Sequence, residues 1–199
     1  SVAAHFGDPM IEQRNLAAGT AIVELGPRGI IAVSGEDRLP WLHSLLSQNL
    51  INLAPGDSAE TLLLDPNGHI EQVIHFLDDG QTSWLIVEAE GRASLLAWLN
   101  KMVFRKKVEI KDRSDDFAVV GHLGEALEEV EISNGITLVW HDPWPGVIAG
   151  GVRYSMARPA VWPWTENLVS VANISSVAAK YLAAGTMAFD ALRIAAHRP

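Results

Sequence analysis

The sequence predicts an α+β fold in which helices cover one face of mainly antiparallel sheets. Two observations indicate this class: short apolar strand patterns alternate with single helical patterns, and tight turns join several of the strands. At 199 residues the chain can form one large domain or two closely packed lobes. We expect two intertwined lobes around a central cleft, the first over residues 1–112 and the second over residues 113–199.

The first lobe has the clearer periodicity. Its hairpin is predicted from the run LLLDPNGHIEQVIHF, because Pro66 presets φ for a turn and Gly68 accepts a positive φ. The elements expected here are strands at Thr20–Leu25 and Ile30–Val33, a helix at Glu36–Asn49, the hairpin Leu62–Phe76, a strand at Trp84–Val87, a helix at Gly91–Val103 and a strand at Val108–Ile110.

The second lobe has weaker periodicity. Trp162, Pro163 and Trp164 indicate an irregular surface stretch, and Gly185 is expected to end a helix as its C-cap. The other expected elements are strands at Phe117–His122, Ile136–Trp140 and Val152–Met156, and helices at Gly124–Val130, Ser175–Ala184 and Phe189–Ala196.

Charge and composition exclude several classes of protein. The net charge of −9 opposes attachment to phosphate backbones and anionic lipid, so neither nucleic acid nor a membrane is expected as a partner. No apolar run approaches the ~20 residues that span a bilayer, and the N-terminus lacks a signal-peptide pattern. With no cysteine, the chain has no thiolate nucleophile or thiolate metal site. We expect a cytoplasmic protein.

Generic catalytic motifs do not occur in the sequence. It contains no P-loop, no Gly-x-Gly-x-x-Gly, no His-Glu-x-x-His and no Gly-x-Ser-x-Gly, and its histidines are too scattered to predict a metal site. Seven tryptophans are many for this length. Trp144, Trp162 and Trp164 fall in predicted loops, where they either pack against the core or line a pocket for a planar ligand.

The second strand of the hairpin departs from the expected alternation of apolar and polar residues. Glu71 and Gln72 are adjacent, so one of them should point to the buried or cleft-facing side. Alternatively, both face solvent at a local irregularity of the strand. The sequence leaves both interpretations open.

The order of several segments resembles the YgfZ-type folate-binding proteins, which are relatives of the glycine cleavage T-protein (aminomethyltransferase). A Gly-x-Asp helix start precedes a Leu-rich helix, an Asp-Pro-x-Gly hairpin follows, and a Leu-Arg-Ile helix comes late. The segments that carry the resemblance are SGEDRLPWLHSLLSQNL, LLLDPNGHIEQVIHF, WLIVEAEGRASLLAWLNKMVFRKKVEIKD, HDPWPGVIAGGVR and AFDALRIAAHRP.

The resemblance implies a domain that binds tetrahydrofolate or a related reduced folate. It assigns the folate site to Glu71, Gln72, Arg153, Phe189 and Arg193. Phe189 and Arg193 are four residues apart and share a helical face. The ring can stack on a pterin and the guanidinium can hold a carboxylate; the alternative is a core phenylalanine and a structural ion pair.

The resemblance also bears on catalysis and partners. In the aminomethyltransferases this hairpin strand carries adjacent aspartates, and a carboxylate there stabilises charge at the reactive folate nitrogen. Glu71 and Gln72 stand in their place. The resemblance therefore implies folate binding without aminomethyl transfer, in support of iron–sulfur cluster assembly or repair in client proteins. Two alternatives remain, an active folate-dependent aminomethyltransferase or demethylase, and an interaction module without ligand.

The resemblance further implies that the chain is the N-terminal portion of a longer protein. The family's Lys-Gly-Cys signature and C-terminal barrel lobe follow the Leu-Arg-Ile helix, and this sequence ends at Pro199, before both. We therefore expect the missing C-terminal part to be a further partner of these residues.

Overall fold

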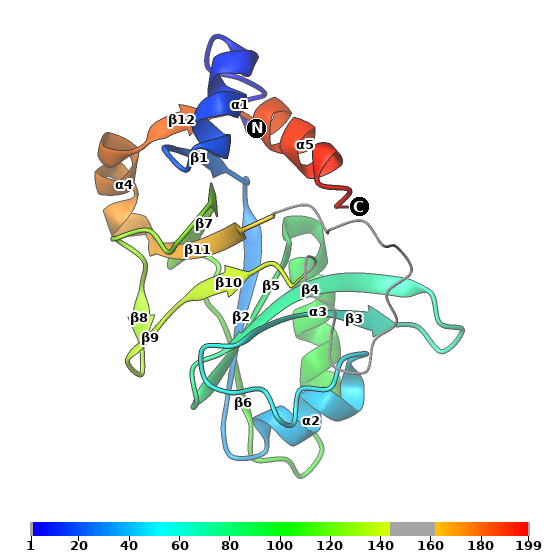
Figure 1. Ribbon diagram of the computed structural model, residues 1–199. Coiled ribbons are helices and arrows are strands. Elements are labelled where there is room, and N and C mark those ends of the chain that lie inside the picture. The colour runs from blue at the N-terminus through cyan, green and yellow to red at the C-terminus, as the bar shows by residue number, and fades with distance from the viewer. Residues whose placement is uncertain (1, 144–161, 199) are drawn as a thin grey trace.

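Two five-stranded sheets with helices packed against them make up the computed structural model, which describes residues 2–143 and 162–198 (Figure 1). Among these residues neighbouring strands of both sheets run antiparallel, except that β1 and β12 pair in parallel. The predicted class, α+β with mainly antiparallel sheet, is therefore confirmed. No helix in this described part is long and apolar enough to cross a membrane.

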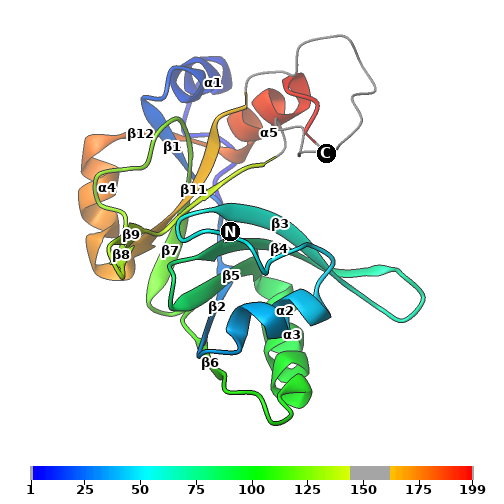
Figure 2. The ribbon, with the colours of Figure 1, turned by 60° about the horizontal axis from the view of Figure 1, so that its bottom comes forward.

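The first sheet uses strands from the first half of the chain, in the spatial order β3-β4-β5-β2-β6. These strands are β2 (Arg28–Ser34), β3 (Ser58–Leu64), β4 (Ile70–Asp78), β5 (Thr82–Glu88) and β6 (Glu109–Asp112). Helices α2 (Arg38–Leu45) and α3 (Ala89–Met102) cover one face (Figure 2). Strand β2 is apolar on both sides, because Ile31 packs under the helices while its neighbour Ile30 packs towards the second sheet.

The second sheet combines N-terminal residues with the second half of the chain, in the order β10-β11-β7-β1-β12. Its strands are β1 (Ala21–Glu24), β7 (Phe117–Leu123), β10 (Val139–His141), β11 (Trp164–Ser170) and β12 (Leu182–Ala184). The remaining elements are α1 (Pro9–Ala17), the hairpin β8 (Ile132–Ser133) and β9 (Ile136–Thr137), the 3-10 turn η1 (Val171–Asn173), α4 (Ile174–Lys180) and α5 (Thr186–Ala195). Because β1 joins this sheet, the two lobes interleave across residue 112, and the division there stays a prediction.

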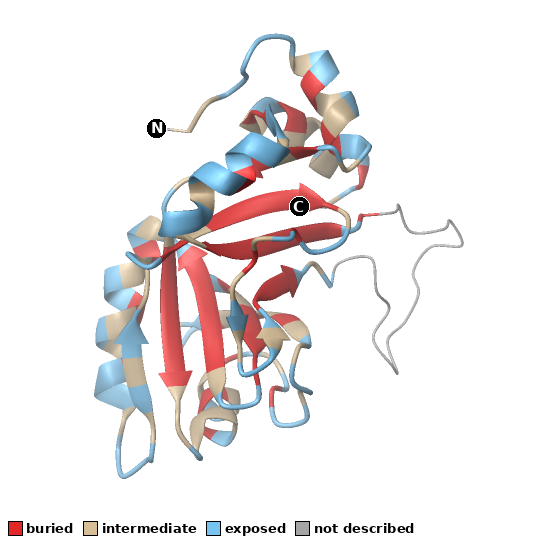
Figure 3. Cartoon of the chain, turned by 90° about the vertical axis from the view of Figure 1, so that its left-hand side faces the viewer, coloured by how far each residue is buried: buried red, intermediate tan, exposed pale blue. Residues whose placement is uncertain are grey.

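The main core lies between the two sheets. Trp84 of β5, Trp140 of β10 and Trp164 of β11 are each at most 3% exposed and share one apolar cluster. Figure 3 shows buried residues concentrated in the strands, whereas the helices present exposed outer surfaces. The candidate site forms where this core between the sheets opens to solvent.

The stretch Trp162–Trp164 differs from the prediction of an irregular surface segment. Trp162 and Trp164 are 3% and 2% exposed, and Trp164 begins β11, which pairs with β7 over its whole length. Strand β11 is buried on both faces, so its sequence lacks the alternation by which a half-exposed strand is recognised. The predicted surface stretch is therefore wrong.

Two predicted helices are also corrected. Residues 124–130 are not helical, because Gly124 has a φ of +143° and Leu127 N–H donates instead to the buried side chain of Asn167. The expected helix Ser175–Ala184 ends at Lys180, and β12 follows it. Gly185 precedes α5 instead of ending a helix; a Cβ there would lie 2.1 Å from the carbonyl oxygen of Ala4. Trp144, Arg153 and the strand expected at Val152–Met156 fall outside the described residues.

Candidate ligand cleft

A cleft of about 540 Å³ opens between the two sheets and α5. Strands β3 and β4 contribute Glu60 and His75, strands β10 and β11 contribute Trp140 and Glu166, and α5 contributes Phe189 and Arg193. Further lining residues are Arg28, Leu62, Ile70, Val73, Glu88, Asp142, Trp162, Trp164 and Arg198. Seven of these fifteen residues are charged and four are aromatic, so the cleft combines aromatic surface with many charged groups.

The aromatic side of the cleft is held in a fixed arrangement. Trp162 and Trp164 stack with ring centroids 5.6 Å apart, and the Phe189 ring lies 4.5 Å from that of Trp164. Trp162 Nε1 donates to Asp142 at 2.8 Å, and Trp140 Nε1 donates to the Ala59 carbonyl at 2.8 Å. These two indoles are therefore anchored at their polar ends, and His75 stacks on the ring of Trp140.

Glu166 supplies a buried carboxylate at the floor of the cleft. It is 3% exposed, and its Oε2 lies 2.8 Å from Nδ1 of His75, whose ring stacks on Trp140 at 3.7 Å. Burial alone would raise the pKa of Glu166, but the nearby His75 and Arg28 outweigh burial and lower that pKa below its ordinary value. Glu166 is therefore ionised at neutral pH, and His75 Nδ1 is the donor of their hydrogen bond.

Two further acids lie on one side of the cleft and are bound by Arg198. Its Nε donates to Asp142 at 2.8 Å, and its terminal nitrogen pairs with Glu60. Glu60 also lies 3.7 Å from Nε2 of His75. This chain of alternating charges joins α5 and its C-terminal extension to the strands of both sheets.

Arg28 and Arg193 are cationic groups of the same cleft. Arg28 pairs with Glu88 through one terminal nitrogen, while its buried Nε has no hydrogen-bond partner among the described residues. Arg193 donates to Asp190 at 3.4 Å and to the Arg198 carbonyl at 3.2 Å, and its side chain is 30% exposed. A buried unpaired donor is costly, and among the described residues no group accepts a hydrogen bond from the Nε of Arg28.

The structure brings together only some of the residues that the sequence assigned to a folate site. Phe189 and Arg193 both line the cleft, but Phe189 also packs against the core and Arg193 pairs with Asp190, as the alternative expects, so a folate contact from either stays a prediction. Glu71 is exposed and is the extra residue of a β-bulge, since Leu63 pairs with Gln72 and Leu64 pairs with Ile70. Glu71 therefore faces solvent at a local irregularity of the strand, as the second interpretation of the sequence expects.

Gln72 points to the other face of the first sheet. Its Nε2 donates to Ser94 Oγ at 3.3 Å, and its Oε1 lies against Gly91 at the start of α3. Glu71 and Gln72 therefore do not line the cleft, and a folate contact from either stays a prediction, as it does for Arg153. Sequence reasoning missed Arg28, His75, Trp140 and Glu166, which four separate strands bring together.

Comparisons with known proteins relate this chain to aminomethyltransferases. It is 27% identical over 113 residues to the aminomethyltransferase of Nitrosococcus oceani, and the matched region covers 56% of this chain and 30% of that protein. It is 33% identical over 95 residues to a chloroplastic protein of Arabidopsis thaliana named as a transferase, covering 47% of this chain and 22% of that protein. No family model matches the chain.

The fold gives the same relationship. The crystal structure of the glycine cleavage system aminomethyltransferase T from Bartonella henselae superposes with a TM-score of 0.64 at 13% identity, over 92% of this chain and 53% of that one. The chain thus has an aminomethyltransferase-like fold and is homologous to these enzymes over about half its length. It spans about half of this solved structure and less than a third of the two relatives named above.

Proposed function

We propose that the cleft binds tetrahydrofolate or a related reduced folate, and that the chain is the folate-binding part of a protein of the aminomethyltransferase type. The single observation that carries the proposal is the buried Glu166, 2.8 Å from His75 at the floor of a cleft between the sheets with aromatic and charged walls. The homology to aminomethyltransferases supports folate as the ligand.

The lining residues suit the chemistry of a folate. A pterin presents a flat ring, which the half-buried Phe189 would contact, with Trp164 packed behind Phe189 at 4.5 Å between ring centroids. It also presents adjacent N–H groups, and a buried carboxylate such as Glu166 would accept hydrogen bonds from them. The glutamate tail is anionic, and Arg28 and Arg193, two of the three arginines that line the cleft, would hold it. A bound reduced folate would supply nitrogen atoms that carry a one-carbon unit.

Folate binding is tested with the full-length protein and two matched variants. Isothermal titration with tetrahydrofolate should give saturable binding, and Glu166→Gln should weaken it roughly 10- to 100-fold, since a hydrogen bond to a charged group contributes about 1.5–3 kcal/mol. The control is Glu125→Gln, an exposed glutamate outside the cleft. Equal affinity for the wild-type and Glu166→Gln proteins, with both folded, would remove the cleft as the folate site.

The second candidate is the YgfZ-type role, in which folate is bound and iron–sulfur clients are supported without aminomethyl transfer. The placement of Glu71 and Gln72 favours it, because neither side chain brings a carboxylate from β4 into the cleft. Turnover of tetrahydrofolate with an aminomethyl-loaded carrier protein separates the two. Robust turnover supports the transferase, whereas tight folate binding with no turnover supports the YgfZ-type role.

A further inference from the structure

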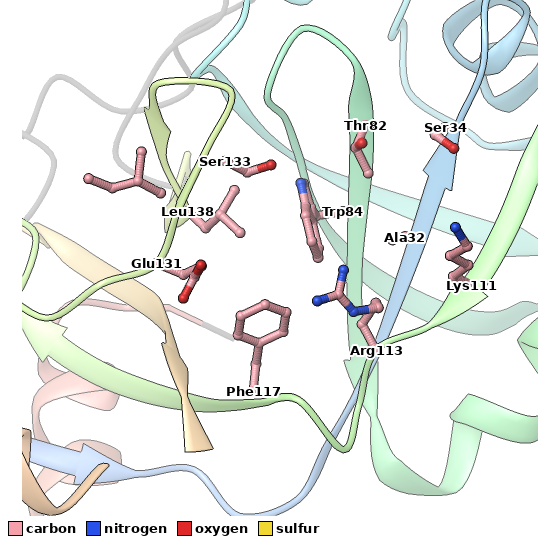
Figure 4. Close-up of a pocket in the computed structure, with 11 residues that line it drawn as sticks. Ala32, Ser34, Thr82, Trp84, Lys111, Arg113, Phe117, Glu131, Ser133 and Leu138 are labelled. Carbon is pink, nitrogen blue, oxygen red and sulfur yellow. The ribbon is translucent and has the colours of Figure 1, made fainter. Parts of the chain in front are cut away.

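A second cavity, of about 220 Å³, lies between the first sheet and the β8–β9 hairpin (Figure 4). We name it the β6 pocket and define it by Ser34, Thr82, Lys111, Arg113, Phe117 and Glu131. It shares no lining residue with the folate cleft. Its volume is far above the ~10–15 Å³ that one water requires, so it can hold a small organic molecule.

One side of the β6 pocket carries positive charge. Arg113 and Lys111 reach it from β6 and the turn that follows (Figure 4). The Arg113 guanidinium lies over the rings of Phe117 at 5.1 Å and Trp84 at 5.7 Å, and its Nε pairs with Asp116. Its two terminal nitrogens have no hydrogen-bond partner among the described residues, so they can donate to a ligand in the pocket.

The side formed by the β8–β9 hairpin carries an opposite charge. Glu131, which directly precedes β8, is half-buried, and in residues 2–143 and 162–198 its carboxylate makes no hydrogen bond and no ion pair. Figure 4 shows it on the other side of Phe117 from Arg113. A carboxylate and a guanidinium that line one cavity without pairing match a ligand that carries both charges.

The pocket is preformed on the side of the hairpin. Asn134 Nδ2 donates to the buried carboxylate of Asp79 at 3.0 Å, which ties the hairpin turn to the turn between β4 and β5. Trp84 Nε1 donates to the same carboxylate at 3.0 Å, so the ring beside Arg113 is also fixed. Binding therefore costs little reorganisation of the wall.

We propose that the β6 pocket binds a small zwitterion, with its carboxylate on Arg113 and its ammonium group on Glu131. Lys111 pairs with Glu109 at 3.1 Å and Arg113 pairs with Asp116 through Nε, so the groups left for a ligand are the terminal nitrogens of Arg113 and the carboxylate of Glu131. A simple anion would leave Glu131 without a partner and a simple cation would leave those nitrogens without one, whereas a zwitterion satisfies both. The hydroxyl groups of Ser34 and Thr82 line the same cavity and offer further hydrogen bonds. The site is independent of the proposed folate cleft.

The test uses the full-length protein and probes that differ in charge and in the spacing of their charges. Glycine, β-alanine and γ-aminobutyrate separate the two charges by one, two and three carbons, while acetate and methylammonium carry one charge each. Isothermal titration should show saturable binding of at least one zwitterion, about tenfold tighter than binding of acetate or methylammonium. Failure of all three zwitterions to saturate at concentrations of about 10 mM would overturn the proposal.

Glu131→Gln then assigns the binding to this pocket. It removes the charge at nearly constant shape, so it should weaken the preferred zwitterion about tenfold and bring its affinity close to that of acetate. The matched control is Glu90→Gln, an exposed glutamate of α3, which should leave both affinities unchanged. Equal zwitterion affinity in the wild-type and Glu131→Gln proteins would contradict the assignment.

Discussion

Asp78 forms a buried ion pair that links α2 to the first sheet, and its removal should destabilise the protein strongly. Arg38 donates to both of its carboxylate oxygens, from Nε at 2.9 Å and from a terminal nitrogen at 2.8 Å, and the two side chains are 12% and 1% exposed. Ser83 Oγ and Gly80 N–H donate to the same carboxylate at 2.7 and 2.8 Å. We expect Asp78→Ala to lower the free energy of unfolding by about 3–5 kcal/mol, because Arg38 is left buried without its counter-charge.

The measurement is urea unfolding of folded, purified variants, with calorimetry as a second readout. For a protein of this size the expected loss corresponds to a Tm lower by roughly 6–20 °C. The matched control is Asp115→Ala, whose carboxylate is 91% exposed and 3.4 Å from Arg92, and which should cost less than about 1 kcal/mol. The double variant Arg38→Met, Asp78→Ala should recover part of the loss, since no unpaired charge then remains.

Equal destabilisation by Asp78→Ala and Asp115→Ala would contradict this expectation, because burial would then not change the contribution of an ion pair to the free energy of unfolding. Simple addition of the effects of the two single changes at Arg38 and Asp78 in the double variant would contradict it as well. Groups in one network should show a coupling energy of about 0.5–3 kcal/mol.

Three further predictions concern the cleft. The pKa of Glu166 is lower in the folded protein than its ordinary value of 4.5, so ionised Glu166 stabilises the protein above pH 4.5. This stabilisation is lost as the pH falls through the lower folded-state pKa. Glu166→Gln should therefore flatten the acid limb of a curve of stability against pH, and an unchanged limb would contradict this. Arg28→Lys keeps the charge but loses the planar guanidinium, so it should weaken tetrahydrofolate binding about tenfold; unchanged affinity in the folded variant would remove Arg28 from the site. Phe189→Ala and Arg193→Ala should each weaken tetrahydrofolate binding about tenfold in the full-length protein, and unchanged affinity in folded variants removes them from the site.

Features with local causes were predicted from the sequence. The hairpin of β3 and β4 follows from its turn residues, and in the structure Gly68 has a φ of +86° and donates its N–H to the Asp65 carbonyl. The spacing of Phe189 and Arg193 placed both on one face of α5, and both line the cleft. In each case residues within one tight turn or one helical turn determine the local structure, so local backbone preference is sufficient to predict it.

Features decided by long-range packing were missed. The pair Glu71 and Gln72 interrupts the alternation because a bulge adds one residue to β4, and no local pattern fixes where a partner strand leaves a residue unpaired. The Trp162–Trp164 stretch contains a proline and two large aromatics, which suggests a loop when neighbours are unknown. Its burial depends on β7, where Gly121 leaves room for the Trp164 ring: a Cβ on that glycine would lie 2.3 Å from the indole.

The cleft shows why such a site is hard to find in a single sequence. Its central pair, His75 and Glu166, is separated by 91 residues, and the two side chains come from different sheets. Strand β11 is buried along nearly its whole length, so Glu166 lies in a segment whose sequence has no period to mark its inward face. The contacts that pack the two sheets together are also the contacts that orient the ligand-binding groups. Variants that loosen the packing between the sheets should therefore lose ligand affinity and stability together, whereas variants on the helix-covered face of the first sheet should lose stability first.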